Sequence, residues 1–377
     1  MTNRFLKYKY LCKSIPWGLI GMVGLLAIVE PWLSKQEMDL SSQVAFWRQS
    51  GEDARRRVAD RTVLCLGDSQ VKMGLVPAVI EYKLGSSAYN LAMASSTAPA
   101  HFFLLRRAIE SGAKPEAIVV DFKANLLAAD LQENAAYWPE LLSARECLEV
   151  SLTARDPEFF AKTMLARGLA SVRLKSKIQT RVLGALRGEK SHARITLAPY
   201  IRNWRVNDGA WVSPSNPSYN GEVQPEDAEL YPETWNCNPV NRTFVKRFLR
   251  LATDQNIKVY WLIAPISPAP QIHREELGFD ALYSEFVREI QAEFLELVVL
   301  DARRSGYDHS VFVDAVHLDR VGAAHLSADV AEIIDQRLTG PAWIKLPRFV
   351  RRDEMPSLED VEQSRMAQQA HVRGARR

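Results

Sequence analysis

The stretch Thr62-Val63-Leu64-Cys65-Leu66-Gly67-Asp68-Ser69 joins a short apolar run to a glycine and two polar side chains. An apolar run of this length, closed by a glycine, predicts a buried β-strand that ends in a tight turn. Ser69 then lies just beyond the carboxyl end of the strand, near the start of the next helix. Functional sites of parallel sheets form at this edge. Ser69 is therefore the first candidate for a reactive group.

The same alternation of strand and helix patterns continues on both sides of a long interruption. Apolar, strand-like runs occur at 87–91, 117–121, 257–263 and 297–300, and helical spacing occurs at 98–111, 244–254, 281–294 and 319–337. Strands that alternate with helices predict a parallel sheet covered on both faces. The expected fold class is α/β, with three α/β/α layers and a mostly helical and loop insertion at about 130–240.

Two further reactive residues stand near the other end of the chain. A serine hydroxyl is a poor nucleophile unless a base removes its proton and a carboxylate orients that base. The segment Val313-Asp314-Ala315-Val316-His317-Leu318 lies between the last predicted strand and the last predicted helix. Its three-residue spacing allows Asp314 to fold back onto the ring of His317. We predict that Ser69 is the nucleophile, His317 its base and Asp314 the carboxylate that orients the base.

Structural roles compete with these assignments. Serine is a frequent helix N-cap, so the alternative role for Ser69 is to cap the helix that follows the strand. His309 and His325 compete with His317 as the base, but neither has a carboxylate three residues before it. Asp319 is better placed to cap the last helix than to take part in catalysis.

The two blocks resemble those of the SGNH/GDSL hydrolase superfamily. The match is Gly67-Asp68-Ser69 as the first block and Asp314-Ala315-Val316-His317 as the last, and it covers about 60–128 and 240–338. The resemblance implies a flavodoxin-like sheet and a serine esterase or O-acyltransferase that needs no metal or cofactor. Gln70 stands where the family often has leucine. No Gly-x-Ser-x-Gly elbow surrounds the serine, which argues against an α/β-hydrolase.

The middle blocks of the family fit less closely. In the family, a glycine after the second strand and an asparagine after the third complete the oxyanion hole beside the backbone N–H of the serine. Here 90–96 has alanine or serine in place of that glycine, and no Gly-x-Asn-Asp follows the third strand. The resemblance therefore implies the N–H groups of Ser69 and Ala92 and the side chain of Asn125 as oxyanion donors, with Lys123 as the rival of Asn125.

The N-terminal segment predicts a membrane anchor. Basic residues precede an apolar run over 15–29, acidic residues follow it, and a helix over 11–33 would be long enough to cross a bilayer. No small-x-small cleavage site follows, so a transmembrane signal-anchor is favoured over a removed signal peptide. We expect a single-pass protein with a cytoplasmic N-terminus and a periplasmic or cell-surface catalytic domain. A buried N-terminal helix is the alternative.

The predicted organisation has four parts. They are a stub and anchor over 1–34, a helical stalk over 35–59, a catalytic domain over 60–340 and a polar, disordered tail over 341–377. The first half of the insertion is basic and helical. It has three interpretations: a solvated face, an amphipathic helix on anionic lipid headgroups, or a surface that attracts an acidic polysaccharide.

Composition limits the other partners. A net charge of +3 is too small to argue for nucleic acid. The four cysteines show no metal-ligand spacing, and only Cys147 and Cys237 are placed to form a disulfide.

The resemblance also implies a substrate class. Membrane-tethered members of the family modify cell-surface polysaccharides, so an acylated carbohydrate or another ester is expected. Hydrolysis and transfer to a sugar hydroxyl use the same triad, and both stay open. The alternative function is a catalytically silent, membrane-anchored scaffold that binds glycan or a partner protein, because the middle blocks are incomplete.

Overall fold

The structure is a computed structural model. It describes the residues 17–35, 42–173, 175–188, 197–223, 234–352 and 354–374. The chain divides into a smaller unit, made of Met1–Leu40 and Ala161–Arg194, and a larger unit, made of Ser41–Phe160 and Ile195–Arg377.

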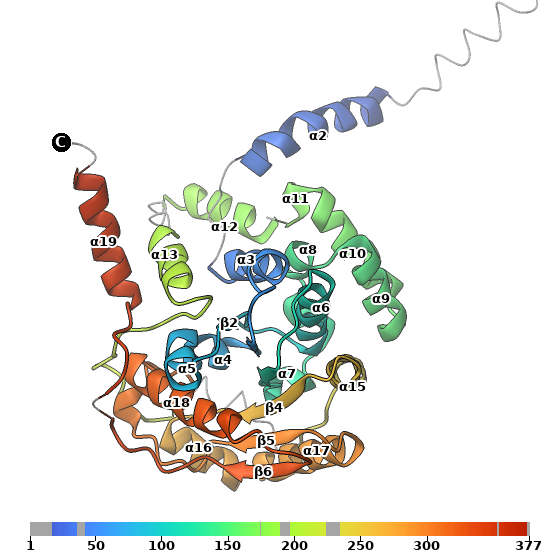
Figure 1. Ribbon diagram of the computed structural model, residues 1–377. Coiled ribbons are helices and arrows are strands. Elements are labelled where there is room, and N and C mark those ends of the chain that lie inside the picture. The colour runs from blue at the N-terminus through green and yellow to red at the C-terminus, as the bar shows by residue number, and fades with distance from the viewer. Residues whose placement is uncertain are drawn as a thin grey trace, which may run out of the picture. The chain divides into compact units, whose positions relative to one another are not determined.

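One six-stranded sheet, in which every pairing is parallel, forms the centre of the larger unit (Figure 1). In sheet order the strands are β2 (Ala88–Asn90), β1 (Val63–Leu66), β3 (Ala117–Val120), β4 (Lys258–Ile263), β5 (Val298–Asp301) and β6 (Ala342–Lys345). The predicted α/β class and parallel sheet are confirmed. The first five strands follow the doubly wound order 2-1-3-4-5, which places a topological switch point between β1 and β3. Ser69 follows β1 and therefore lies at that point.

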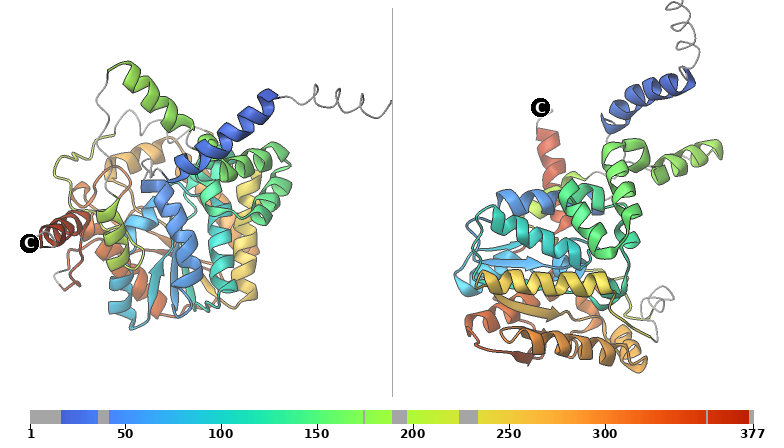
Figure 2. Two further views of the ribbon diagram at one scale, coloured as in Figure 1. Left: turned by 90° about the horizontal axis from the view of Figure 1, so that it is seen from above. Right: turned by 90° about the vertical axis from the view of Figure 1, so that its right-hand side faces the viewer.

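Alternate side chains of the strands face two different helical layers. Cys65, Leu262 and Leu300 belong to a core shared with three helices, which are α4 (Ser69–Gly74), α5 (Pro77–Leu84) and α18 (Arg320–Asp335). On the opposite face, the ring of Trp261 packs against Phe122 and Phe286. The helices α6 (Ala98–Glu110), α15 (Pro239–Asp254) and α17 (Phe279–Glu293) lie side by side over this face (Figure 2).

Shorter helices connect these layers and form the insertion. They are α7 (Ala124–Ala128), η1 (Leu131–Asn134), α8 (Trp138–Leu141), α9 (Ala144–Ala154), α10 (Pro157–Gly168), α11 (Ala170–Arg173), α12 (Lys175–Leu186), α13 (Ala198–Val206), α16 (Pro268–Glu276) and η2 (His309–Val311). Cys147 and Cys237 form no disulfide with each other.

The predicted stalk is wrong for most of its length, because α3 (Ser42–Arg56) is part of the larger unit. Trp47 is fully buried, and Asp53 accepts hydrogen bonds from Tyr89 Oη at 2.6 Å and Trp204 Nε1 at 2.8 Å. A carboxylate shared by a strand residue and an insertion residue fixes the helix to both. The charged residues from Glu52 onward predicted a solvated stalk, but one of them, Asp53, is buried and holds α3 in the larger unit.

The predicted disordered tail is also wrong over its described residues. β6 pairs with β5 in parallel, with Val298 opposite Ala342 and Asp301 opposite Lys345. Farther on, α19 (Val361–Gly374) packs against α13, and Arg202 of α13 forms an ion pair with Glu359 at 2.7 Å. The segment therefore completes the sheet and covers α13.

The smaller unit contains α2 (Trp17–Lys35), which contacts α11. Glu30 of α2 accepts a hydrogen bond from the Ser171 N–H at 3.1 Å. Among the residues that the structure describes, none of the helices has both the length and the apolar character that crossing a membrane requires. The start of the predicted span and the basic residues before it fall in 1–16, outside the described residues. The helices α10 to α12 expose Leu165, Leu183 and Leu186, and the three interpretations of this basic stretch stay open.

Candidate active site

The turn that carries Ser69 depends on Gly67. Gly67 has φ of +147°, and a Cβ atom there would lie 2.7 Å from Cγ2 of Val71. Asp68 is the N-cap of α4, because its carboxylate accepts a hydrogen bond from the Gln70 N–H at 2.8 Å. The capping role that competed for Ser69 therefore belongs to Asp68. The hydroxyl of Ser69 is left for other contacts.

The structure brings the three predicted catalytic side chains together. His317 Nε2 lies 2.7 Å from Ser69 Oγ, across 248 positions of sequence. On the other side of the ring, His317 Nδ1 lies 2.7 and 2.9 Å from the two carboxylate oxygens of Asp314. With a carboxylate as its partner, Nδ1 carries the proton, so Nε2 is the nitrogen that accepts the serine proton. This is the geometry of a nucleophile, a base and an orienting acid.

Asp314 is held as an anion by its own loop. Its Oδ1 accepts hydrogen bonds from the N–H groups of Val316 and His317, each at 3.0 Å. Partial burial opposes ionisation, but the bond and charge of His317 and these two N–H groups outweigh it, so the pKa of Asp314 is lowered. An antiparallel bridge between Phe312 and Leu318 closes the loop at its base.

The rival histidines have other surroundings. His309 is exposed and its Nδ1 lies 3.5 Å from the carboxylate of Asp308. His325 is buried in α18, where its Nε2 accepts a hydrogen bond from the Arg352 N–H at 3.1 Å. Asp319 caps α18 through the N–H groups of Val321 and Gly322, as predicted.

Residues that no local sequence pattern indicated hold the loop of Asp314 and His317. Gln70 Nε2 donates to the carbonyl of Val316 at 3.3 Å, and the Ser267 N–H donates to that of Ala315 at 2.9 Å. From the insertion, Asn216 Nδ2 donates to the carbonyl of Val313 at 2.7 Å. Long-range contacts of this kind carry no pattern in sequence, so only the departure of Gln70 from leucine was visible beforehand.

The N–H of Ala92, a predicted oxyanion donor, already has a partner. Its N–H donates to Asn90 Oδ1 at 2.9 Å. The amide of Asn90 also donates to the carbonyls of Val71 and Leu75, at 2.9 and 2.7 Å, so the side chain is fixed on three sides. An oxyanion would have to compete with Asn90 for the Ala92 N–H. A side-chain acceptor two residues earlier already satisfies that donor, so the role of Ala92 stays a prediction.

The other two predicted oxyanion donors stay predictions. Ser69 is the first residue of α4, where N–H groups have no partner within the helix. Asn125 lies in α7, and its buried Oδ1 has no hydrogen-bond partner among the described residues. Lys123, the rival of Asn125, extends to within 3.6 Å of Asp68 Oδ2, where it balances the charge of that buried acid.

A second serine and histidine lie behind the turn. Ser96 Oγ lies 2.9 Å from the carbonyl oxygen of Gly67 and 2.8 Å from His101 Nε2. Burial lowers the pKa of His101 to about 3, so its ring is neutral. Both residues are buried, so this pair supports the Gly67 carbonyl and does not reach solvent.

Next to the turn lies a buried acid. Burial, and then the charge of Asp68, raise the pKa of Asp121 well above its ordinary value, against the effects of Lys123 and Arg274. Within the described ranges, no three His, Cys, Asp or Glu side chains gather in an arrangement that would hold a metal ion.

Comparisons with known proteins add no assignment: no protein-family model matches this chain, and no curated protein does. The geometry alone indicates what the site can do. A half-buried serine, hydrogen-bonded to a histidine that reaches the surface, suits attack on an acyl carbonyl.

Proposed function

We propose that the chain is a serine hydrolase of the SGNH/GDSL type that acts on an ester. The observation that carries the proposal is the 2.7 Å contact between Ser69 Oγ and His317 Nε2, with Asp314 behind the ring. The resemblance of the two terminal blocks and the position of Ser69 at the switch point of the sheet support it.

The proposed reaction has two steps. Ser69 Oγ attacks the acyl carbonyl while His317 Nε2 takes the hydroxyl proton, and the tetrahedral intermediate forms. As the ester bond breaks, His317 returns the proton to the leaving alcohol, which leaves an acyl group on Ser69. Water or a sugar hydroxyl then attacks this acyl group, and its proton passes through His317 back to Ser69. Asp314 stays ionised and stabilises the imidazolium in both steps.

The developing oxyanion needs donors beside the carbonyl carbon. The N–H of Ser69 is the first of them, and the side chain of Asn125 is the second. Loss of one such donor costs roughly 10²–10³ in rate. An enzyme with a single donor would therefore be slow.

The substrate and location follow from the resemblance and the N-terminal sequence. We propose an acylated carbohydrate outside the cytoplasm, reached by a domain tethered through the apolar run over 15–29. The basic helices α10 to α12 would then lie near anionic lipid or anionic glycan. Esterase and O-acyltransferase activity are both included, since the acceptor alone distinguishes them.

A silent scaffold is the second candidate, and the occupied N–H of Ala92 favours it. In that case the hydrogen bond between Ser69 and His317 would have a structural role near a binding surface.

Turnover of p-nitrophenyl acetate by the full-length chain separates the two. We expect hydrolysis by the wild type, a fall of roughly 10³-fold or more in kcat for Ser69→Ala and His317→Ala, and little change for His309→Ala. The His309 variant is the matched control, because that histidine also lies beside an aspartate. Addition of an oligosaccharide acceptor then measures how the acyl group divides between water and sugar. No turnover by a folded wild type, or equal turnover by all variants, contradicts the proposal.

A further inference from the structure

A cavity of about 480 Å³ opens beside the edge strand of the sheet. It is bounded by α17, by α16 and by the last residues of β5 and β6, and its lining includes Ser284, Arg288, Asp301, Arg303, Trp343 and Lys345. Asp301 and Lys345 are paired in register at the carboxyl ends of their strands. The cavity therefore opens at the same edge of the sheet as the Ser69 turn.

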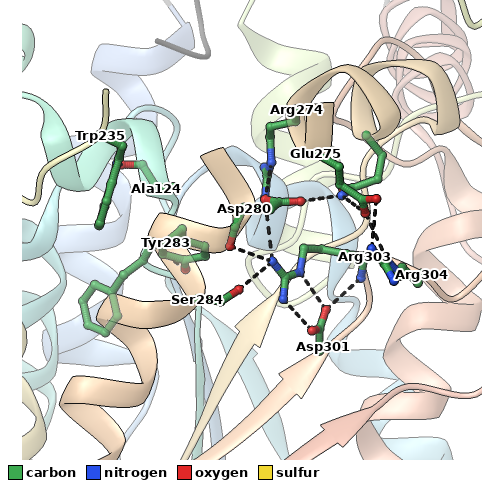
Figure 3. A network of polar contacts seen from close by, with 12 residues as sticks. Ala124, Trp235, Arg274, Glu275, Asp280, Tyr283, Ser284, Asp301, Arg303 and Arg304 are labelled. Carbon is green, nitrogen blue, oxygen red and sulfur yellow. Dashed lines mark hydrogen bonds and ion pairs between the residues drawn. The ribbon is translucent and has the colours of Figure 1, made fainter. Parts of the chain in front are cut away.

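The floor of this cavity is a fixed polar network (Figure 3). Arg303 donates through Nε and Nη2 to the two carboxylate oxygens of Asp301, at 2.9 and 2.6 Å, and through Nη1 to Ser284 Oγ at 2.9 Å. Trp343 Nε1 donates to Asp301 Oδ2 at 3.1 Å. Burial opposes ionisation of Asp301, but Arg303 and Trp343 outweigh it and lower the pKa of the acid. Both carboxylate oxygens of Asp301 are thus bonded, and its charge is balanced by that of Arg303.

The other acids of the cavity are neutralised in the same way. Arg274 Nε donates to Asp280 Oδ1 at 2.6 Å, and Arg304 Nη2 donates to Glu275 Oε2 at 3.0 Å. Figure 3 shows these pairs around Arg303, which also lies 3.6 Å from Asp280. Each carboxylate in the lining thus has an arginine partner.

Two cations at the cavity are left over. Among the described residues, no carboxylate forms an ion pair with Arg288 or with Lys345. The guanidinium carbon of Arg288 lies 5.0 Å from the centre of the Trp343 ring, a cation–π contact beside the cavity. Lys345 is exposed at the end of β6. The charges of Arg288 and Lys345 over a neutral floor give the cavity an excess of positive charge.

We propose that this cavity binds one anionic sugar residue of a glycan substrate, through a carboxylate or a phosphate group. Arginine matches both groups with its planar donors, and lysine adds a point charge. The volume of the cavity suits a single sugar residue, and the polar floor offers hydrogen-bond partners to the hydroxyl groups of the sugar. The inference rests on the proposed function, because it places the rest of the glycan along the carboxyl edge of the sheet, toward Ser69.

The connection between cavity and triad supports this direction. The segment that contributes Arg303 and Arg304 to the cavity continues directly to Asp314 and His317. The cavity and the loop of His317 therefore both take residues from the single connection between β5 and α18.

Calorimetric titration of the full-length chain with a trigalacturonate tests the inference. We expect binding that weakens as salt rises, no binding of neutral maltotriose, and a loss of roughly tenfold or more in affinity in Arg288→Gln/Lys345→Gln. The matched control is Lys114→Gln/Arg250→Gln, which removes two exposed cations outside the cavity lining and should leave the affinity unchanged.

The activity assay distinguishes the two proposals. Turnover of p-nitrophenyl acetate should be the same in both double variants and the wild type, while KM for an acetylated oligouronate should rise only in the cavity variant. Equal trigalacturonate affinity in wild type and cavity variant overturns the inference. Inorganic phosphate that binds without being displaced by trigalacturonate overturns the glycan assignment. If the wild type binds trigalacturonate but does not turn over p-nitrophenyl acetate, the proposed function alone is contradicted.

Discussion

Gln70 Nε2 donates a hydrogen bond to the carbonyl of Val316 at 3.3 Å, so the residue after Ser69 holds the residue before His317. Gln70 is buried, and its own N–H is used by the Asp68 cap. The contact spans 246 positions of sequence and joins the turn that carries Ser69 to the loop that carries His317. It gives a physical reason for glutamine at a position where leucine would serve for packing alone.

Gln70→Leu should therefore lower kcat with little effect on KM for p-nitrophenyl acetate. Leucine fills the space but leaves the Val316 carbonyl without its donor, and a misplaced catalytic group loses roughly 10–100-fold in rate. Gln291→Leu is the control, because Gln291 also donates to two carbonyls, of Leu297 and Ala342, away from the triad. An unchanged kcat in Gln70→Leu would show that the tie has no catalytic effect.

Gly67→Ala should damage both stability and activity. The new methyl group would meet Val71 at 2.7 Å, and the positive φ is strained for any residue with a Cβ atom. We expect a loss of about 1–3 kcal/mol in the free energy of unfolding and a larger loss of turnover. Gly112→Ala separates strain from collision, since Gly112 has φ of +96° with open space around it. Similar losses of turnover in both variants would contradict the role of the Val71 contact.

Ser96→Ala should destabilise the protein by about 1–3 kcal/mol, because the Gly67 carbonyl and His101 Nε2 would lose a buried partner. Urea denaturation measures this difference. Thr243→Ala removes an exposed hydroxyl bonded within its own helix and should change stability little. A Ser96 variant as stable as the Thr243 variant would show that the buried pair does not support the turn.

Asp329 gives a pH dependence of stability. Burial raises its pKa from 3.8 to about 6, although Arg352 Nη2 lies only 2.6 Å away and opposes the shift. Between these two values the folded state holds more protons than the unfolded state, so the contribution of Asp329 to stability falls as pH rises through that window. The full change is at most about 3 kcal/mol. Asp329→Asn should flatten the profile. Glu332→Gln, at the exposed partner of the same arginine, should flatten it only in part, because the charge of Glu332 is a smaller cause of the raised pKa than burial.

Local patterns were enough to predict the frame of the site. The apolar run before Gly67 predicted a strand that the structure contains, and the spacing of Asp314 and His317 predicted a fold-back that the N–H groups of the loop now explain. Such features depend on neighbours in sequence, so they are readable from it.

Features that depend on distant partners were not predictable. Asp53 is buried in α3, where the distant residues Tyr89 and Trp204 donate to it, although its sequence neighbours are charged. β6 has only four residues, and its partner β5 decides that it is a strand. The side chain of Asn90 accepts the hydrogen bond of the Ala92 N–H, and no sequence pattern indicates that contact.

The most direct measurement is labelling of the full-length chain with a fluorophosphonate, followed by mass spectrometry of the modified peptide. The proposed mechanism predicts one phosphonyl group on Ser69 of the wild type, none on Ser69→Ala, and much slower labelling of His317→Ala. A folded wild type that takes up no label, or label that persists in Ser69→Ala, would contradict the assignment of Ser69 as the nucleophile.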